Sequence, residues 1–491
     1  MQNILIIMGD QHRAECIGSY GNKDIRTPHL DALARDGVRY TQHYTTYPVC
    51  TPSRYSFLSG LYAHQHGGWD NHCTLASGFD TFPKVLVQSG YHTVAVGKMH
   101  MTPTYLEVGF QKMILAEQDG DGRFEDDYHL YLKDRNLLDE NDIQDQRQEY
   151  REKAGQSYWD TFGAIKSNLP ERHHSTAWIT DRALEELDMW GAEGNMLFVS
   201  YIKPHHPFDP PAPYDTMYDP ETLQLLPGYT ESVSDLDYEH SHGYFDHKNL
   251  TPDKLKRIMA HYYGSISHMD YHIGRIINAL KQKGLYENTL ILYTSDHGDY
   301  MGYHHMLLKS NYMYDPLVRI PLIVKYPGGE RAGEVNDAIS NNLDIAPTIL
   351  HQAGVRIPQN MKGLDLRNPK AERKMTICEG LRTDHYSTGK ANYYEYMVRS
   401  GRYKLIINKN LDHWLFFDLE KDPLESEDVS ENPAYREILL RHRDYLLQTL
   451  VFDAPAGVYL NEEEKSILNK GTQKECVRDY CRIYFEQRGE K

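Results

Sequence analysis

The residues of this chain best suited to chemistry form one short run, Cys50-Thr51-Pro52-Ser53-Arg54. Proline fits the first turn of a helix, so Pro52 predicts that Cys50 lies at a helix N-terminus. That end of a helix carries partial positive charge, and the nearby Arg54 adds a full one, so an anion is favoured there. A cysteine before a helix is more often a small buried hydrophobic residue. In this setting the run predicts a nucleophile or an anion-binding site.

Four short apolar runs are each followed by polar side chains that could join this site. The runs are residues 4–8, 93–96, 196–202 and 290–294, and the polar pairs after them are Asp10 with Gln11, Lys98 with His100, His205 with His206, and Asp296 with His297. Such runs, separated by helical patterns as at 27–37 and 252–284, are typical of parallel strands covered on both faces. Because open α/β sheets place their chemistry at the carboxyl ends of strands, we expect one active site at that edge.

The elements that must position these residues predict two domains. Residues 1–370 carry the α/β pattern, for which we expect a large mixed, mostly parallel sheet sandwiched by helices. Beyond them, residues 403–407 and 414–418 are predicted as paired strands of a small antiparallel sheet. We therefore expect a smaller C-terminal α+β domain over 371–491. Its charged tail could serve docking, which leaves a homo-oligomer open.

Composition narrows the class of partner. The chain has 491 residues, with 53 Lys and Arg against 70 Asp and Glu, and a formal net charge of −17. This charge argues against nucleic acid or an anionic membrane as the main partner. No apolar run approaches the roughly 20 residues that span a bilayer, and the first ten residues lack signal-peptide features, so we expect a cytoplasmic protein. Six unevenly spaced cysteines predict reduced thiols and no disulfide framework.

The C-x-P-x-R pentapeptide resembles the signature of the formylglycine-dependent (type I) sulfatases, a family of the alkaline phosphatase superfamily. Seven further segments resemble that family in the same order: Asp10-Gln11, Thr27-Pro28-His29-Leu30-Asp31, Gly97-Lys98-Met99-His100, Lys203-Pro204-His205-His206-Pro207-Phe208, Ser295-Asp296-His297-Gly298-Asp299, Lys309, and Phe417-Asp418-Leu419-Glu420-Lys421-Asp422-Pro423. The resemblance implies an alkaline phosphatase-like fold and a sulfuric ester hydrolase that releases an alcohol and inorganic sulfate. It also implies that a formylglycine-generating or anaerobic sulfatase-maturating enzyme oxidises Cys50 to formylglycine.

The resemblance further implies a divalent metal site. Its ligands would be Asp10, Gln11, Asp296 and His297, together with an oxygen of the modified Cys50. The commonest pattern of the family has Asp in place of Gln11 and Asn in place of His297, so this site has one carboxylate fewer and gains an imidazole. Oxygen ligands suit calcium, which is the expected ion, whereas an imidazole makes manganese or zinc the alternatives.

Catalytic roles also follow from the resemblance. Arg54, Lys98 and Lys309 would neutralise the sulfate oxygens and the leaving group. His100 would be the base that breaks down the covalent intermediate. His205 would contact the bridging oxygen or act as the general acid, a role that it would share with Lys309.

Two other functions remain compatible with the sequence. The first is a phosphonate monoester or phosphodiester hydrolase of the same superfamily, because some such relatives carry Gln and His in the metal site. The second is a non-catalytic binding protein in which Cys50 is never oxidised, although the many charged site residues argue against it. For a sulfatase, we expect a small anionic substrate, the sulfate ester of a carbohydrate or aryl alcohol, and the sequence does not choose between them.

Overall fold

The computed structural model describes residues 1–118, 125–138, 155–234, 237, 245, 247–310, 312–368, 370, 372–382, 393–407, 414–453, 461, 462 and 464. Its main element is an eight-stranded sheet with the order β5-β4-β6-β1-β7-β8-β2-β9. In that order the strands are Lys112–Leu115, His92–Gly97, Asn195–Pro204, Asn3–Asp10, Thr289–Ser295, Leu322–Lys325, Val38–Tyr40 and Val335–Asn336. The four predicted apolar runs are strands β1, β4, β6 and β7, so this part of the prediction is confirmed.

The sheet is mixed and mostly parallel, as predicted. Strands β5, β4, β6, β1 and β7 pair in parallel, and their carboxyl ends therefore lie at one edge. Strand β8 pairs antiparallel with both β7 and β2, and β9 joins β2 in parallel. The polar residues that follow β1, β4, β6 and β7 are thus brought to the same side of the molecule.

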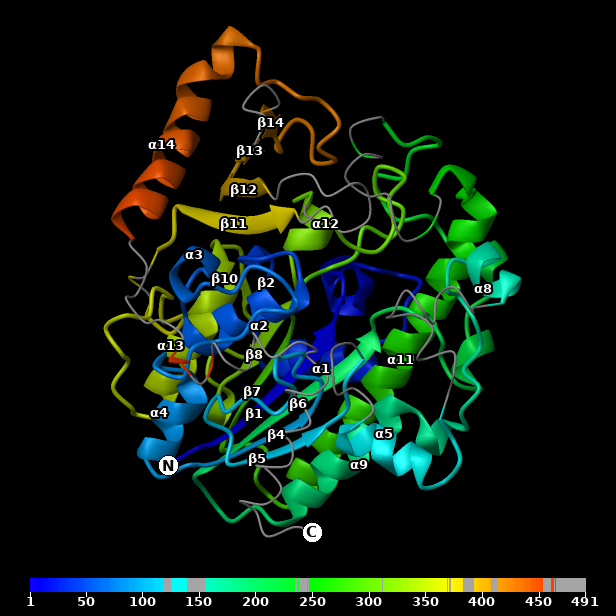
Figure 1. Cartoon of the computed structure of the whole chain (residues 1–491), viewed down its shortest axis with the longest axis vertical. Coiled ribbons are helices and arrows are strands. Elements are labelled where there is room, and N and C mark those ends of the chain that lie inside the picture. The colour runs from blue at the N-terminus through cyan, green and yellow to red at the C-terminus, as the bar shows by residue number, and fades with distance from the viewer. Residues whose placement is uncertain are drawn as a thin grey trace.

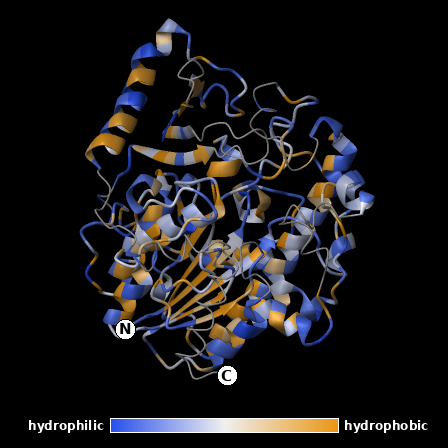
Figure 2. Cartoon of the chain, in the orientation of Figure 1, coloured by the Kyte–Doolittle hydropathy of each residue, from blue (hydrophilic) through white to orange (hydrophobic). Residues whose placement is uncertain are grey.

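Helices cover both faces of this sheet (Figure 1). One layer contains α1 (Pro28–Asp36), α9 (Ser175–Asp188) and α11 (Pro252–Gln282), and the other contains α2 (Cys50–Ser59), α4 (Phe82–Gln88) and α13 (Ile345–Gln352). Strand β1 alternates between the two cores: Leu5 and Ile7 pack with the α11 layer, whereas Ile4, Ile6 and Met8 pack with the α2 layer. Because both faces of the sheet are apolar, its strands are coloured as hydrophobic (orange) in the middle of the large unit in Figure 2.

Shorter elements complete the large unit. They are α3 (Ala63–His66), α5 (Asp127–Lys133), α8 (Gln156–Asp160), α12 (Asp315–Val318) and the strand pair β3 (His43–Tyr44) and β10 (Ser340–Asn341). Within the described part of the chain, no helix is both long and apolar enough to cross a membrane. Cys16, Cys50, Cys73 and Cys378 are free thiols, as predicted, whereas Cys476 and Cys481 lie outside the described residues.

A second, four-stranded antiparallel sheet follows near the C-terminus (Figure 1). Its strands are β11 (Met375–Arg382), β12 (Tyr393–Ser400), β13 (Tyr403–Ile407) and β14 (Trp414–Asp418), and α14 (Arg436–Phe452) packs against it. Strands β13 and β14 confirm the two predicted runs, whereas β11 and β12 were not predicted. The sheet packs on the large unit through a cluster that includes Tyr44, Tyr300, Cys378 and Phe417. The domain boundary at 370/371 stays a prediction, and from residue 465 onward the charged tail lies outside the described residues.

Gly97 is the last residue of β4 and sets the direction of the backbone into Lys98. Its φ of +102° belongs to a region that residues with a Cβ rarely adopt. A Cβ at this position would lie 2.0 Å from the carbonyl oxygen of Ser200 on β6. The same oxygen accepts a hydrogen bond from the amide of Lys98 at 2.8 Å. Only glycine therefore allows β4 to end against β6 with Lys98 at the active edge.

We expect Gly97→Ala to destabilise the fold by more than about 3 kcal/mol, because it adds a backbone clash to an unfavourable φ. Gly90→Ala is the matched control. Gly90 has a φ of +88° and open space where a Cβ would stand, so only the backbone cost of about 1–2 kcal/mol applies. Denaturant unfolding of both variants measures the difference. Equal losses of stability would show that the contact with Ser200 does not constrain Gly97.

Candidate active site

The residues predicted to hold a metal meet at the carboxyl edge of the large sheet. Asp10 ends β1, Asp296 and His297 follow β7, and β1 and β7 are paired neighbours. The first residue of α2, Cys50, reaches the same point, with its Sγ 3.2 Å from Nε2 of His297 and 3.8 Å from Oδ1 of Asp10. Each of these four buried side chains offers a ligand atom within 4.8 Å of the others. Four of the five predicted ligands, which come from distant parts of the sequence, are thus brought together by the ends of β1 and β7 and the start of α2.

Gln11, the fifth predicted ligand, is held in place by Asp299, to which the sequence analysis assigned no role. Its Nε2 donates to Oδ2 of Asp299 at 2.6 Å, and its backbone amide donates to Oδ1 of Asp296 at 3.1 Å. The remaining side-chain atom, Oε1, is buried without a hydrogen-bond partner among the described residues. A buried amide oxygen that accepts no hydrogen bond has lost its contact with water and gained no replacement. Such an oxygen is suited to bind a cation. Asp299 could have been noticed from its place two residues after His297.

The tautomer of His297 also fits a metal ligand. Its Nδ1 lies 2.9 Å from the carbonyl oxygen of Gly298, which can only accept, so Nδ1 carries the proton and Nε2 keeps its lone pair. Burial lowers the pKa of His297 to about 4, which keeps the ring neutral. Two carboxylates, an amide oxygen and a neutral imidazole therefore form a donor set that fits one divalent cation.

Three cationic side chains surround the two carboxylates. Lys98 Nζ lies 2.8 Å from Asp10, and Arg54 donates to Asp10 at 2.9 Å and to Asp296 at 3.0 Å. Lys309 Nζ lies 3.0 Å from Cys50 Sγ. Burial alone would raise the pKa of Asp10, but the charges of Lys98 and its neighbours hold it well below the usual value, so the carboxylate stays ionised. The excess of cations makes the site a binding place for an anion.

Lys309 and His205 form a polar pair above Cys50. Lys309 Nζ lies 3.1 Å from Nε2 of His205. The other ring nitrogen, Nδ1, lies 2.6 Å from the carbonyl oxygen of His206, so it carries the proton of the neutral ring. Nε2 of His205 therefore accepts a hydrogen bond from the ammonium group of Lys309. The ring of His206 stacks on the ring of His205, with the two centroids 4.2 Å apart. This stacking holds the plane of the His205 ring.

His100 lies on a loop that the buried carboxyl group of Glu117 holds in place. Oε1 of Glu117 accepts from the amides of Met99 at 2.9 Å and His100 at 3.1 Å, and Oε2 accepts from the latter amide at 3.0 Å. The backbone of His100 has a φ of +52°, which the hydrogen bonds to the carboxyl group of Glu117 help to stabilise. Burial has the largest effect on the pKa of His100 and the positive charge of Lys98 the second largest, and both keep this pKa well below its usual value. A neutral ring can accept a proton.

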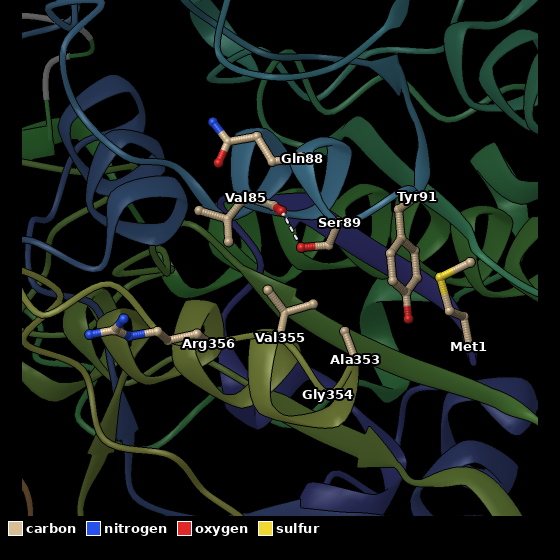
Figure 3. Close-up of a pocket in the computed structure, with 9 residues that line it drawn as sticks. All are labelled: Met1, Val85, Gln88, Ser89, Tyr91, Ala353, Gly354, Val355 and Arg356. Carbon is tan, nitrogen blue, oxygen red and sulfur yellow. Dashed lines mark hydrogen bonds between the residues drawn. The ribbon is translucent and has the colours of Figure 1, made fainter.

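A cavity of about 610 Å³ lies elsewhere, between the C-terminal ends of α4 and α13 (Figure 3). Met1, Ser89, Gly354 and Arg356 are among its lining residues, and Ser89 donates to the carbonyl oxygen of Val85 there. It contains none of the predicted site residues. Because Met1 precedes β1, the cavity lies at the amino ends of the strands, so we do not place the substrate there.

Glu117 gives a testable pH dependence of stability. Burial raises its pKa to about 8, above the usual 4.5, so between these values the folded protein holds a proton that the unfolded chain has lost. Stability therefore falls as pH rises from about 4.5 to about 8, by at most about 1.4 kcal/mol per pH unit from this group. We expect Glu117→Gln to flatten the slope of unfolding free energy against pH in this window.

The control for that measurement is Glu107→Gln. The side chain of Glu107 is 63% exposed, so this substitution makes the same chemical change at a surface position. Identical slopes for wild type and Glu117→Gln between pH 5 and 8 would contradict the assignment of the proton to Glu117.

Comparison with known proteins agrees with this geometry. The profile of the family described as "Sulfatase" matches residues 2–355, and the profile described as "N-sulphoglucosamine sulphohydrolase, C-terminal" matches residues 302–450. An arylsulfatase of Clostridium perfringens is 30% identical over 91% of this chain and 93% of its own length. An N-acetylglucosamine-6-O-sulfatase of Bacteroides thetaiotaomicron is 28% identical over 88% of this chain and 83% of its own length.

Solved structures with a similar fold agree with the alkaline phosphatase superfamily. A phosphonate monoester hydrolase of Agrobacterium radiobacter superposes with a TM-score of 0.76 and 25% identity, over 92% of this chain and 96% of the other. The family profile covers more than half of the chain and includes every predicted site residue. The chain therefore belongs to the sulfatase family, within the alkaline phosphatase superfamily, and is a sulfuric ester hydrolase.

Proposed function

We propose that this protein hydrolyses the sulfate ester of a small carbohydrate or aryl alcohol, with Cys50 converted to formylglycine as the nucleophile. The observation that carries the proposal is the position of Cys50. Its Sγ lies at the start of α2, 3.0 Å from Lys309 Nζ and 3.2 Å from His297 Nε2. A group at this point faces both the candidate metal ligands and the cation best placed to meet a sulfate oxygen.

The thiol itself is a poor nucleophile, which supports the modification. Burial, followed by the charge of Asp10, raises the pKa of Cys50 to about 11, whereas nucleophilic cysteines have a lowered pKa. A hydrated aldehyde at this position would supply two hydroxyls, one to attack sulfur and a second whose deprotonation expels sulfate. The proposal therefore includes a formylglycine-generating or anaerobic sulfatase-maturating enzyme as a partner of the newly made chain.

Asp10, Gln11, Asp296 and His297 would hold a divalent cation, which would supply a positive charge to polarise the sulfate group. We assign calcium, because oxygen donors outnumber the single nitrogen, and the imidazole of His297 supports manganese or zinc as alternatives. Lys98 then stabilises the ionised carboxylate of Asp10. Its ammonium group also contributes to the positive field that binds a sulfate ester.

Lys309 and His205 would serve the leaving alcohol. The hydrogen bonds at His205 support Lys309 as the group that holds the transferable proton, because Nε2 of His205 is left as the acceptor of its N–H. We infer that Lys309 donates a proton to the bridging oxygen and that His205 orients the ammonium group. His100, kept neutral by burial, is the proposed base that removes a proton from position 50 in the second half of the reaction.

The proposed activity is tested with p-nitrophenyl sulfate, sulfated mono- and disaccharides, and a phenyl phosphonate monoester of the same leaving group. We expect wild-type protein to release sulfate faster than phosphonate. Cys50→Ala should lower kcat/KM at least about 10³-fold while the protein stays folded. Mass analysis of the peptide that contains position 50 should find the aldehyde in the active fraction.

Cys73→Ala is the matched control, because Cys73 is a second free thiol that is not among the predicted site residues, and its Sγ donates to the carbonyl oxygen of Asp70. It should keep full activity. An active preparation with only unmodified thiol at Cys50 would refute the mechanism. Faster cleavage of the phosphonate ester would instead favour the alternative function, a phosphonate monoester or phosphodiester hydrolase, which the fold of the Agrobacterium radiobacter enzyme supports.

A second prediction separates the roles of the cations by leaving group. An alkyl or sugar alcohol needs a proton in the transition state, whereas p-nitrophenolate scarcely does, so loss of a general acid should cost about 10²–10⁴-fold for the former only. We expect Lys309→Ala to show this selective loss, and His205→Ala to show it more weakly. Lys98→Ala should slow both substrates alike. An equal effect of Lys309→Ala on both substrates would exclude Lys309 as the acid.

A further inference from the structure

A second group of metal-binding side chains lies where the turn before α9 contacts the middle of α11. His268 and His272 are one helical turn apart on α11, so their rings share one face of the helix. Nε2 of His268 lies 3.1 Å and Nε2 of His272 lies 2.8 Å from the same atom, Oε1 of Glu171. The two nitrogens lie 3.1 Å from each other. Three lone-pair atoms from two separate elements therefore converge on one point.

The triangle that these atoms form has the size of a face of a small tetrahedral site. Zinc binds imidazole nitrogen and carboxylate oxygen at about 2.0–2.2 Å, which places neighbouring ligand atoms about 3.3 Å apart. The observed sides of 2.8, 3.1 and 3.1 Å are slightly shorter. A small rotation of the Glu171 side chain, which is 37% exposed, would lengthen the two sides that end on its Oε1. The third side, between the two histidine nitrogens, is already close to that value at 3.1 Å.

Hydrogen bonding alone satisfies this arrangement poorly. If both rings donated an N–H to Oε1 of Glu171, the two hydrogens would crowd each other, because their nitrogens are only 3.1 Å apart. If Nε2 of one ring instead accepted a hydrogen bond from Nε2 of the other, the accepting nitrogen would turn its lone pair toward the lone pairs of the Glu171 carboxylate, which repel it. Both rings are buried, and Nδ1 of His268 has no hydrogen-bond partner among the described residues, so Nε2 is the only ring nitrogen of His268 that makes polar contacts there. A cation would take all three lone pairs at once.

Binding would change one existing contact. Nη1 of Arg275 lies 3.2 Å from Nδ1 of His272, which requires a lone pair on that nitrogen. With a cation at Nε2, the proton of the neutral ring moves to Nδ1, and this long contact opens. Arg275 keeps its hydrogen bond to Asp181 at 2.9 Å, so the guanidinium retains a partner.

We propose that Glu171, His268 and His272 bind one divalent transition-metal ion of the zinc class, with water as the fourth ligand on the exposed side of Glu171. Two imidazoles and one carboxylate suit zinc, whereas calcium and magnesium need six or more oxygen ligands. The site would fasten the turn before α9 to α11. It is independent of the proposed hydrolysis, because none of its ligands belongs to the active site.

Cobalt(II) tests the proposal, since it replaces zinc and absorbs visible light strongly in tetrahedral nitrogen and oxygen sites. Wild-type protein is dialysed against chelator and titrated with Co²⁺ while metal content is measured by elemental analysis. We expect one equivalent with tetrahedral absorption, in addition to any ion at the active site. His272→Ala should remove that absorption and lower the affinity of this equivalent at least about tenfold.

His261→Ala is the matched control, because His261 lies on the same helix with its Nδ1 bonded to the carbonyl of Arg257, and it should bind as wild type. Circular dichroism checks that each variant is folded. If His272→Ala unfolds, Glu171→Gln decides the question, since its partly exposed side chain can change without loss of packing, and it should also lose the absorption. Equal metal content and equal spectra for wild type and the folded variants would overturn the proposal, as would wild type without tetrahedral absorption.

Discussion

The active site depends on one buried side chain, Arg54, whose guanidinium joins the elements that build it. It donates to Asp10 at the end of β1 and to Asp296 after β7, and its Nη1 donates to Ser200 on β6 at 2.9 Å and to the carbonyl of Lys98 after β4 at 2.7 Å. Both carboxylates are fully buried, which would cost several kcal/mol each without a partner. A planar guanidinium has five N–H donors and here serves four acceptors at once, more than the three donors of a lysine could reach. Four strand ends are therefore fixed relative to each other through one residue.

This contact gives the pentapeptide spacing a physical reason. Cys50 and Arg54 are four residues apart in α2, so they share a face of the helix, and the ion pairs of Arg54 direct Cys50 toward Asp10 and His297. The hydrogen bonds that the structure gives Arg54 are with two protein carboxylates, the hydroxyl of Ser200 and a carbonyl. Direct neutralisation of sulfate oxygens by Arg54 stays a prediction. Its demonstrated environment is that of a positioning residue, whereas Lys309, which contacts Cys50 itself, faces the place where a substrate would bind.

The strand ends could be predicted because hydrophobic runs identify buried parallel strands and parallel strands share an edge. The hydrogen-bond partners of the supporting residues could not be predicted. Glu117 and Asp299 act through hydrogen bonds to loop amides and to Gln11, and such partners depend on the register of distant elements. His268 and His272 lie in a helix whose apolar spacing predicts only a core face, and nothing in the sequence places Glu171 beside them. Strands β11 and β12 alternate charged and apolar residues too irregularly to be recognised. Cytoplasmic location and homo-oligomerisation stay predictions.

The charge of the site also explains how an acidic protein binds an anion. The chain carries a formal charge of −17, but at the sheet edge three cations face two carboxylates, and a bound divalent ion would increase the excess. Burial opposes still more positive charge, and the pKa values of His100 and His205 are accordingly held well below the usual value. The two histidines therefore stay neutral and keep the lone pairs that the proposed proton transfers need, while Arg54, Lys98 and Lys309 carry the positive charge that the proposed binding of a sulfate ester needs. Local burial, and not the net charge of the surface, thus decides which groups bind charge and which move protons.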